Sequence, residues 1–172
     1  MARRERQETL SRVQLYTDPL QHVLIAAVVT APLVARGGKR VLATAVTAAL
    51  VIDVDHAIAA RSLRVRHTTS LSLRPRSHSL VTAALAGALV AAAAGPLHGW
   101  AAFSALGSHL LHDAGDRAAP TPVLWPWRPA RQLGRRVQLA GTVLLTTGSA
   151  IVAGWDGARA RARSAACDRG GS

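Results

Sequence analysis

Apolar residues in this chain gather in long runs rather than in the short amphipathic segments of a soluble domain. The runs are built mainly from Ala, Val and Leu and cover residues 20–35, 41–60, 79–97, 99–114 and 137–155. The third and fifth approach the roughly 20 residues that span a bilayer, whereas the others are short or carry charge and would have to tilt or lie against neighbours. The pattern predicts an all-α, polytopic membrane helix bundle with five spans, or with four if one run lies at the interface.

Polar segments divide the chain into three parts. Residues 1–19 form a basic N-terminal segment, residues 20–155 form the membrane bundle, and residues 156–172 form an Arg/Ala-rich tail that we expect to be disordered. Two long connections, 61–78 and 114–136, are rich in Arg and contain Pro, which argues against a continuous helix there.

Composition supports a lipid environment. Hydrophobic residues make up 49% of the chain but aromatic residues only 3%, whereas soluble cores draw much of their buried area from large aromatic side chains. Small residues allow helices to approach closely in lipid. The formal net charge of +12 would also suit a nucleic-acid-binding protein, but the basic residues flank the apolar runs and no nucleic-acid-binding motif is present. We therefore expect membrane lipids, and not nucleic acid, as partners.

The distribution of Lys and Arg predicts an orientation. With five spans, the N-terminal segment and the two long connections share one side and hold four, five and five Lys or Arg residues. The turns at 36–40 and 95–99 and the tail share the other side and hold three, none and four. The positive-inside rule then places the N-terminal segment and the long connections in the cytoplasm.

Acidic residues are rare within the apolar region. Between residues 19 and 155 the only acids are Asp53, Asp55, Asp113 and Asp116, and all four lie at the ends of apolar runs beside histidines. A charged side chain in a membrane helix costs about 2.5–3.5 kcal/mol on insertion scales. Such residues are kept where they pair, bind ions or take part in chemistry.

The fourth apolar run carries the first candidate metal ligands. His109 and Asp113 are four residues apart and share a helical face, so an imidazole nitrogen and a carboxylate oxygen could bind one ion. Asp116 would lie close to the same face if the helix continued past Gly115. The alternative is an ordinary exposed helix end.

The second run ends with a similar pattern. Asp53 and His56 are three residues apart and can face together, whereas Asp55 points elsewhere on a regular helix. Either Asp55 orients a histidine, or the helix opens and all three side chains converge. The alternative is an ordinary helix terminus before the arginine-rich connection, which two carboxylates within a Val/Ile/Ala run make less favourable.

The segment before the third run adds a histidine and basic residues. His78 lies where the chain re-enters the membrane, and Ser77 or Ser79 could cap the helix that follows. Arg76, and also Arg74, could hold a phosphate oxyanion through paired hydrogen bonds.

The topology brings these candidates to one membrane face. The run that ends with Asp53, Asp55 and His56 exits on the side where His78 begins the next run, and where the run with His109 and Asp113 returns. His22 opens the first run on that same side. His98 lies in the opposite turn, and we interpret it as a loop residue.

These strings in this order resemble a known family, the YdjM-type membrane-bound metal-dependent hydrolases. The resemblance covers roughly residues 20–130 and rests on Gln21-His22, Asp53-Val54-Asp55-His56, Arg76-Ser77-His78-Ser79, Ser108-His109 through Asp113, and the Pro/Trp segment at 122–127. It implies a multi-pass protein of the cell (inner) membrane with a metal site, whose ligands are His22, Asp55, His56, His78, His109 and Asp113. The family is in turn similar to zinc-dependent phospholipase C and P1-type nucleases, which implies phosphoester cleavage.

The resulting hypothesis is metal-assisted hydrolysis. One or more divalent ions, with Zn²⁺ favoured by the His/Asp ligands, would activate a water molecule. Asp53 or Asp116 would act as base or orienting group, and Arg76 would stabilise negative charge. A site at the membrane surface favours a small-molecule or lipid substrate, such as a phospholipid. The alternative is a non-enzymatic membrane protein that carries or senses metal ions or protons, and a third is a structural protein whose arginines bind anionic lipid.

Overall fold

The computed structural model describes residues 2–62, 72–115 and 119–170, with side chains from residue 19 to residue 167 outside the gaps. Within these ranges the chain is helical with no β-strand, apart from one isolated bridge between Thr121 and Arg131. The helices are α1 (Ala2–Val51), α2 (Val54–Ala60), α4 (Leu80–Ala94), α5 (Pro96–Gly115) and α6 (Arg135–Gly170). The predicted all-α class is confirmed for the described residues.

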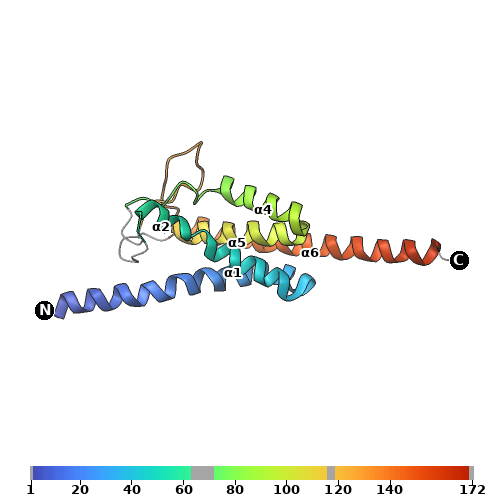
Figure 1. Ribbon diagram of the computed structural model, residues 1–172, viewed down its shortest axis with the longest axis horizontal. Coiled ribbons are helices and arrows are strands. Elements are labelled where there is room, and N and C mark those ends of the chain that lie inside the picture. Colours follow the sequence, from blue (N-terminus) through green and yellow to red (C-terminus); the bar gives the residue numbers. More distant parts are fainter. Residues whose placement is uncertain (1, 63–71, 116–118, 171–172) are drawn as a thin grey trace.

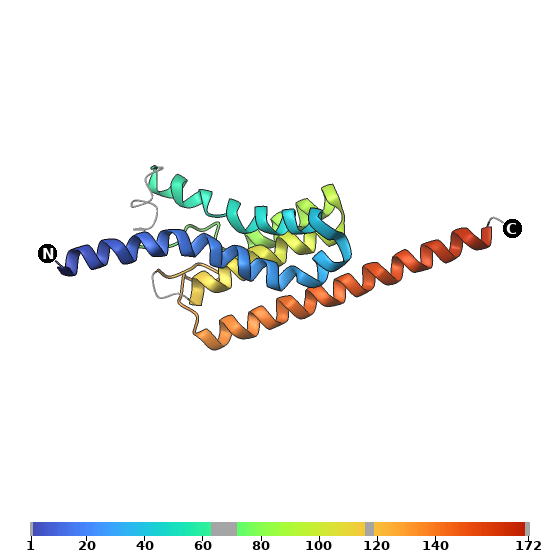
Figure 2. The same ribbon diagram turned by 90° about the horizontal axis from the view of Figure 1, so that it is seen from below.

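The helices run back and forth along one long axis. α1 turns at Gly38, whose φ of 67° favours glycine, and its second arm lies alongside its first (Figures 1 and 2). Gly95, with φ 93°, forms the tight turn between α4 and α5. The turns predicted at 36–40 and 95–99 therefore lie at one end of the bundle, and α2 lies at the other (Figure 1).

The second arm of α1 is interrupted before α2. Residues 52 and 53 form a turn, and the amide of Asp53 donates to the carbonyl oxygen of Leu50 at 3.3 Å. A regular helix would bond that amide to the carbonyl of Ala49, four residues back. This interruption, called the opened turn below, leaves the Ala49 carbonyl without its helical partner, while Asp53 keeps right-handed helical angles (φ −70°, ψ −13°).

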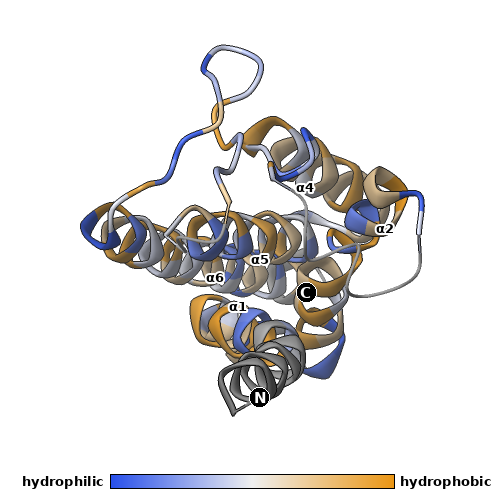
Figure 3. Ribbon diagram, turned by 90° about the vertical axis from the view of Figure 1, so that its left-hand side faces the viewer, coloured by the Kyte–Doolittle hydropathy of each residue, from blue (hydrophilic) through white to orange (hydrophobic). Residues whose placement is uncertain are grey.

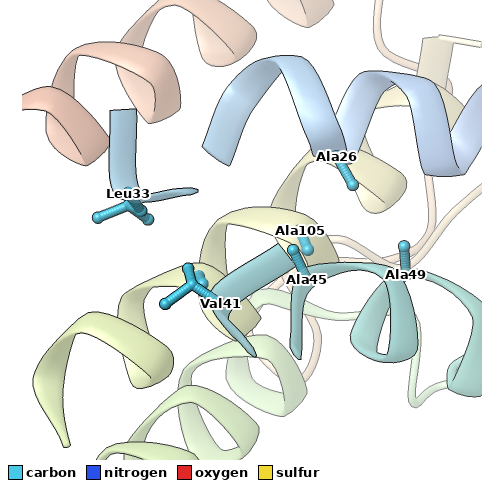
Figure 4. Packing of buried hydrophobic residues seen from close by; sticks show 7 residues of the cluster. Ala26, Leu33, Val41, Ala45, Ala49 and Ala105 are labelled. Atoms are coloured by element: carbon cyan, nitrogen blue, oxygen red, sulfur yellow. The ribbon is translucent and has the colours of Figure 1, made fainter. Parts of the chain in front are cut away.

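Small residues let the helices approach closely. A Cβ on Gly99 of α5 would lie 2.4 Å from the Cβ of Ala91 and 2.6 Å from the carbonyl oxygen of Gly87, both in α4. Ala45, Ala49 and Ala105 belong to the buried core between α1 and α5 (Figure 4). Without large side chains to separate them, the helices gain stability from backbone-close packing.

Polar side chains lie inside the bundle and large apolar ones lie outside. Fully buried polar residues include Thr30, Ser104 and Ser149, whereas Leu89, Leu144 and Ile151 are each more than 60% exposed. Hydrophobic segments occur in α1, α4, α5 and α6, and hydrophilic ones gather near the end of α2 and in the connecting segments (Figure 3). An apolar exterior of this extent is typical of a surface that contacts lipid.

Two helical segments have the length and hydropathy needed to cross a membrane, Pro19–Ala60 and Arg135–Cys167, and Leu80–Ala94 is a shorter apolar helix. The expected four or five spans therefore remain a prediction. The tail from residue 156, expected to be disordered, instead continues α6 as helix to Gly170.

Candidate metal centre

Histidines and aspartates from five parts of the chain meet at the end of the bundle where α5 ends. His22 comes from the first arm of α1, Asp53 from the opened turn, and the rest from α2, the segment before α4, and α5. The side chains brought together are His22, Asp53, Asp55, His56, His78, His109 and Asp113. This set holds all six predicted metal ligands together with Asp53.

Four potential ligand atoms lie close to one another at the centre of the cluster. Asp53 Oδ1 lies 3.3 Å from His109 Nε2 and 3.9 Å from His78 Nε2. Asp113 Oδ2 lies 3.4 Å from each of the same two nitrogens. Zinc–nitrogen and zinc–oxygen bonds of about 2.0–2.2 Å in a tetrahedron imply ligand separations of about 3.3–3.6 Å. Three of these four contacts fall within that range and the fourth is slightly longer, so each carboxylate oxygen lies about as far from the histidine nitrogens as two ligands of one ion do.

Hydrogen bonds at the far ring nitrogens orient both central histidines. His109 Nδ1 lies 2.9 Å from the carbonyl oxygen of Ala49, which the opened turn has freed. His78 Nδ1 lies 3.0 Å from Asp55 Oδ2, and the hydroxyl of Ser77 donates to the same oxygen. With Nδ1 protonated in each ring, Nε2 presents its lone pair to the cluster, which is the usual arrangement of a metal-binding histidine.

A second group adjoins the first. His56 Nδ1 lies 3.2 Å from Asp55 Oδ1 and 3.6 Å from Asp53 Oδ1, and its ring lies edge to face with that of His78. Asp53, His56 and His78 could hold an ion, as could the neighbouring trio of His22, His109 and Asp113. Asp53 lies between both groups, because it contacts side chains from each.

His22 closes the buried side of the cluster. Its ring stacks on that of His109 with centroids 3.6 Å apart, and its Nε2 lies 3.5 Å from Asp113 Oδ1. His112 lies edge to face against His22 and 3.4 Å from Gln138 Nε2. The sequence did not single out His112 or Gln138 as neighbours of the site, because that contact joins α5 to α6.

Arg74, rather than Arg76, lies in the cluster. Its guanidinium contacts Asp113 Oδ1 and His56 Nε2, both at 3.2 Å, and its backbone amide donates to the carbonyl of Pro120. Arg76 is exposed and lies 5.9 Å from the ring of Trp125. Arg74 therefore contacts the cluster directly and Arg76 does not, and a catalytic role for Arg76 stays a prediction.

The remaining sequence candidates lie elsewhere. Ser79, not Ser77, caps α4 by accepting a hydrogen bond from the amide of Thr82. His98 lies in the first turns of α5, at the opposite end, where its Nδ1 is 2.8 Å from the Thr44 hydroxyl. Asp116 falls outside the described residues.

The cluster lacks positive charge to balance its carboxylates, and several of its ligand atoms lack a hydrogen-bond partner in the described residues. Among the described residues it contains three carboxylates and one arginine, Arg74, so with neutral histidines the cluster carries an excess of negative charge. Several ligand atoms are buried without a hydrogen-bond partner in the described part of the chain: His22 Nδ1, Asp55 Oδ1, His56 Nδ1, His78 Nε2, His109 Nε2 and Asp113 Oδ2. Buried charge and buried lone pairs are costly unless they are paired. A divalent cation satisfies both demands, so the residues fit a metal.

Comparison with known proteins gives a family. The model of the family described as YdjM inner membrane protein matches residues 18–167, which include the whole cluster. No curated protein and no solved structure gives a significant match.

Proposed function

This chain belongs to the YdjM inner membrane protein family, and we propose that it is a multi-pass, metal-dependent hydrolase. Its substrate would be a phosphoester of an amphiphilic or anionic molecule, such as a phospholipid. The observation that supports this most strongly is the convergence of two imidazole nitrogens and two carboxylate oxygens, with nitrogen–oxygen distances of 3.3–3.9 Å, at one end of a helical bundle.

The contacts suggest separate roles for the two aspartates around α2. Asp53 contacts both central histidines through one oxygen, so we assign it to the metal. Asp55 contacts the outward nitrogen of His78, so we assign it to orienting that ring. This reverses the ligand set that the family resemblance implies, in which Asp55 binds the metal.

The ligands of the proposed central ion are His78, His109, Asp53 and Asp113. His22 and His56 belong to two separate trios, each of which could hold an ion. A divalent ion held there would lower the pKa of a bound water towards about 7 and polarise a phosphoryl oxygen. Arg74 supplies a fixed positive charge beside Asp113, where it would stabilise charge that develops on a phosphoryl group. The hypothesis of Asp116 as a base stays open.

The position of the cluster favours a substrate at the membrane surface. Asp53 is 35% exposed while His78 and Asp113 are almost fully buried, so the cluster opens on the Asp53 side. Apolar helices lead to it from the lipid side, and arginine-rich connections surround it in sequence. Both features suit an amphiphile whose phosphate reaches the cluster while its apolar part stays in lipid. By the positive-inside rule this face is cytoplasmic.

Hydrolysis by the purified full chain tests the proposal. We expect turnover of a phosphodiester or phosphomonoester reporter, or of phospholipid in mixed micelles, that a chelator abolishes and Zn²⁺ or Mn²⁺ restores. Asp113→Asn keeps the shape of the side chain but removes its charge, so the variant should insert and purify as a monodisperse species without activity. Wild-type protein that binds metal and yet hydrolyses none of these substrates would overturn the proposal and favour metal or proton handling.

A further inference from the structure

A groove lies at the end of the bundle opposite to the metal cluster. α4 and α6 both pack on α5 and flank it (Figure 3), which leaves a groove of about 460 Å³ with α5 as its floor. Leu97, Trp100 and Phe103 line the floor, Ala84 and Ala88 line the α4 wall, and Val152 lines the α6 wall. This volume lies within the range of about 300–1,000 Å³ that is typical of small-molecule sites.

The groove follows the helix axes and changes character along its length. From Ala84 to Ala91 on one wall, seven residues of helix span about 10 Å. Its inner part is entirely apolar, while its outer end, near the turn at Gly95, carries Asp156 and Arg159. An apolar groove with charged residues at one end matches an amphiphile that lies parallel to the helices, with its polar group at the charged end.

The charges at the outer end favour an anion. Asp156 pairs with Arg36 of α1, with Oδ2 3.2 Å from Nε, so its negative charge is compensated. Arg159 lies 4.0 Å above the ring of Trp155, and the described residues place no carboxylate within ion-pair distance of it. The turn at 36–40 adds Lys39 and Arg40 at the same end of the bundle.

We propose that this groove binds one acyl chain of an anionic phospholipid, with the phosphate at Arg159. Both walls are apolar helices with lipid-like exteriors, and Ile151, next to the lining residue Val152, is exposed. A chain of the surrounding lipid can therefore enter sideways without desolvating polar groups. The position of Arg159, level with the ion pair of Arg36, suits a phosphate at the membrane boundary. This site does not rest on the hydrolase proposal, because the two lie at opposite ends of α5.

Tryptophan fluorescence can detect this binding. The chain has four tryptophans, and Trp125→Phe with Trp127→Phe leaves Trp100 and Trp155, which both line the groove. Phospholipids with brominated acyl chains are titrated into this protein in detergent micelles, with a phosphatidylglycerol and a phosphatidylcholine compared. We expect quenching that saturates at a low mole fraction of the anionic lipid and requires a higher fraction of the zwitterionic one.

Two variants test the groove and the charge separately. Ala88→Phe fills the groove and should remove the saturable quenching, whereas Leu89→Phe, on the exposed face of the same helix, should keep it. Arg159→Gln cannot collapse the groove and should weaken the preference for the anionic lipid by roughly two- to fivefold. Quenching that rises linearly with both lipids, or that is equal in the two phenylalanine variants, would show bulk contact only and overturn the site. Saturable quenching without preference between the lipids would overturn the anionic assignment.

Discussion

The Nδ1 atom of His109 lies 2.9 Å from the carbonyl oxygen of Ala49, on a helix 60 residues earlier in the chain. That carbonyl is available because α1 opens just beyond it, where the Asp53 amide bonds to Leu50 instead. The same local break thus supplies the hydrogen-bond acceptor that orients His109. It also contains Asp53, whose Oδ1 lies 3.3 Å from Nε2 of His109. One interrupted helical turn thus provides contacts to both ring nitrogens of His109.

Loss of a central histidine should remove metal. We expect His78→Ala or His109→Ala to lower the metal bound after dialysis strongly, because each Nε2 faces two carboxylate oxygens with no other partner in the described chain. His98→Ala is the matched control, since it lies at the far end beside Thr44. Elemental analysis of purified protein measures the effect, and equal losses in all three variants would contradict the assignment.

Substitution of Asp53 should reduce metal binding more than substitution of Asp55. Asp53→Asn removes a proposed ligand and should nearly abolish binding, whereas Asp55→Asn removes a partner of His78 and should weaken metal affinity by roughly 10- to 100-fold. Competition with a zinc-binding dye gives both affinities. Full binding by the Asp53 variant, with complete loss in the Asp55 variant, would restore the ligand set that the family resemblance implies.

Replacing Arg74 should reduce hydrolysis more than replacing Arg76, although the sequence favoured Arg76 as the residue that stabilises negative charge. Arg74→Gln removes the cation that contacts Asp113 and His56 and should lower kcat on the order of 100-fold. Arg76→Gln removes an exposed side chain near Trp125 and should leave hydrolysis close to wild type. Metal content measured in parallel distinguishes lost catalysis from a lost site, and a larger effect at Arg76 would contradict the geometry.

The contact between α4 and α5 should not tolerate a methyl group. Gly99→Ala would place its Cβ 2.4 Å from that of Ala91, and overpacking of this kind costs about 1–3 kcal/mol. Gly154→Ala has no heavy atom within 4 Å and should be neutral or slightly stabilising, because alanine favours helix. Thermal denaturation in detergent compares the two, and a similar Tm for both variants would argue against close packing at Gly99.

The two ends of the bundle should lie on opposite sides of the membrane. In a Cys167→Ser background, Ala94→Cys and Ser72→Cys place single thiols at opposite ends of α4, both at exposed positions. A thiol reagent that does not cross membranes should label Ala94→Cys in intact cells and Ser72→Cys only after lysis. Labelling of both from the same side would refute the predicted topology.

The sequence by itself determined the helical class, the turns at both ends and most of the site. Five apolar runs of Ala, Val and Leu can satisfy their backbone in lipid only as helices, and all five are helical in the structure. The rarity of acids in those runs identified Asp53, Asp55 and Asp113 beside their histidines, because charge in an apolar segment is costly. Helical spacing also placed His109 and Asp113 on a common face.

Only the tertiary structure decided how those residues are used. The opened turn at Asp53 follows from no residue that favours a break, and its stability depends on contacts with α5 that local spacing does not encode. The choice of Arg74 over Arg76 depends on a bend held by hydrogen bonds from Arg74 to Pro120 and from Leu80 to Val123, in a distant connection. The groove between α4 and α6 likewise arises because both helices pack on α5. Periodicity reports which face of a helix a residue occupies, whereas site geometry depends on which other helix lies against that face.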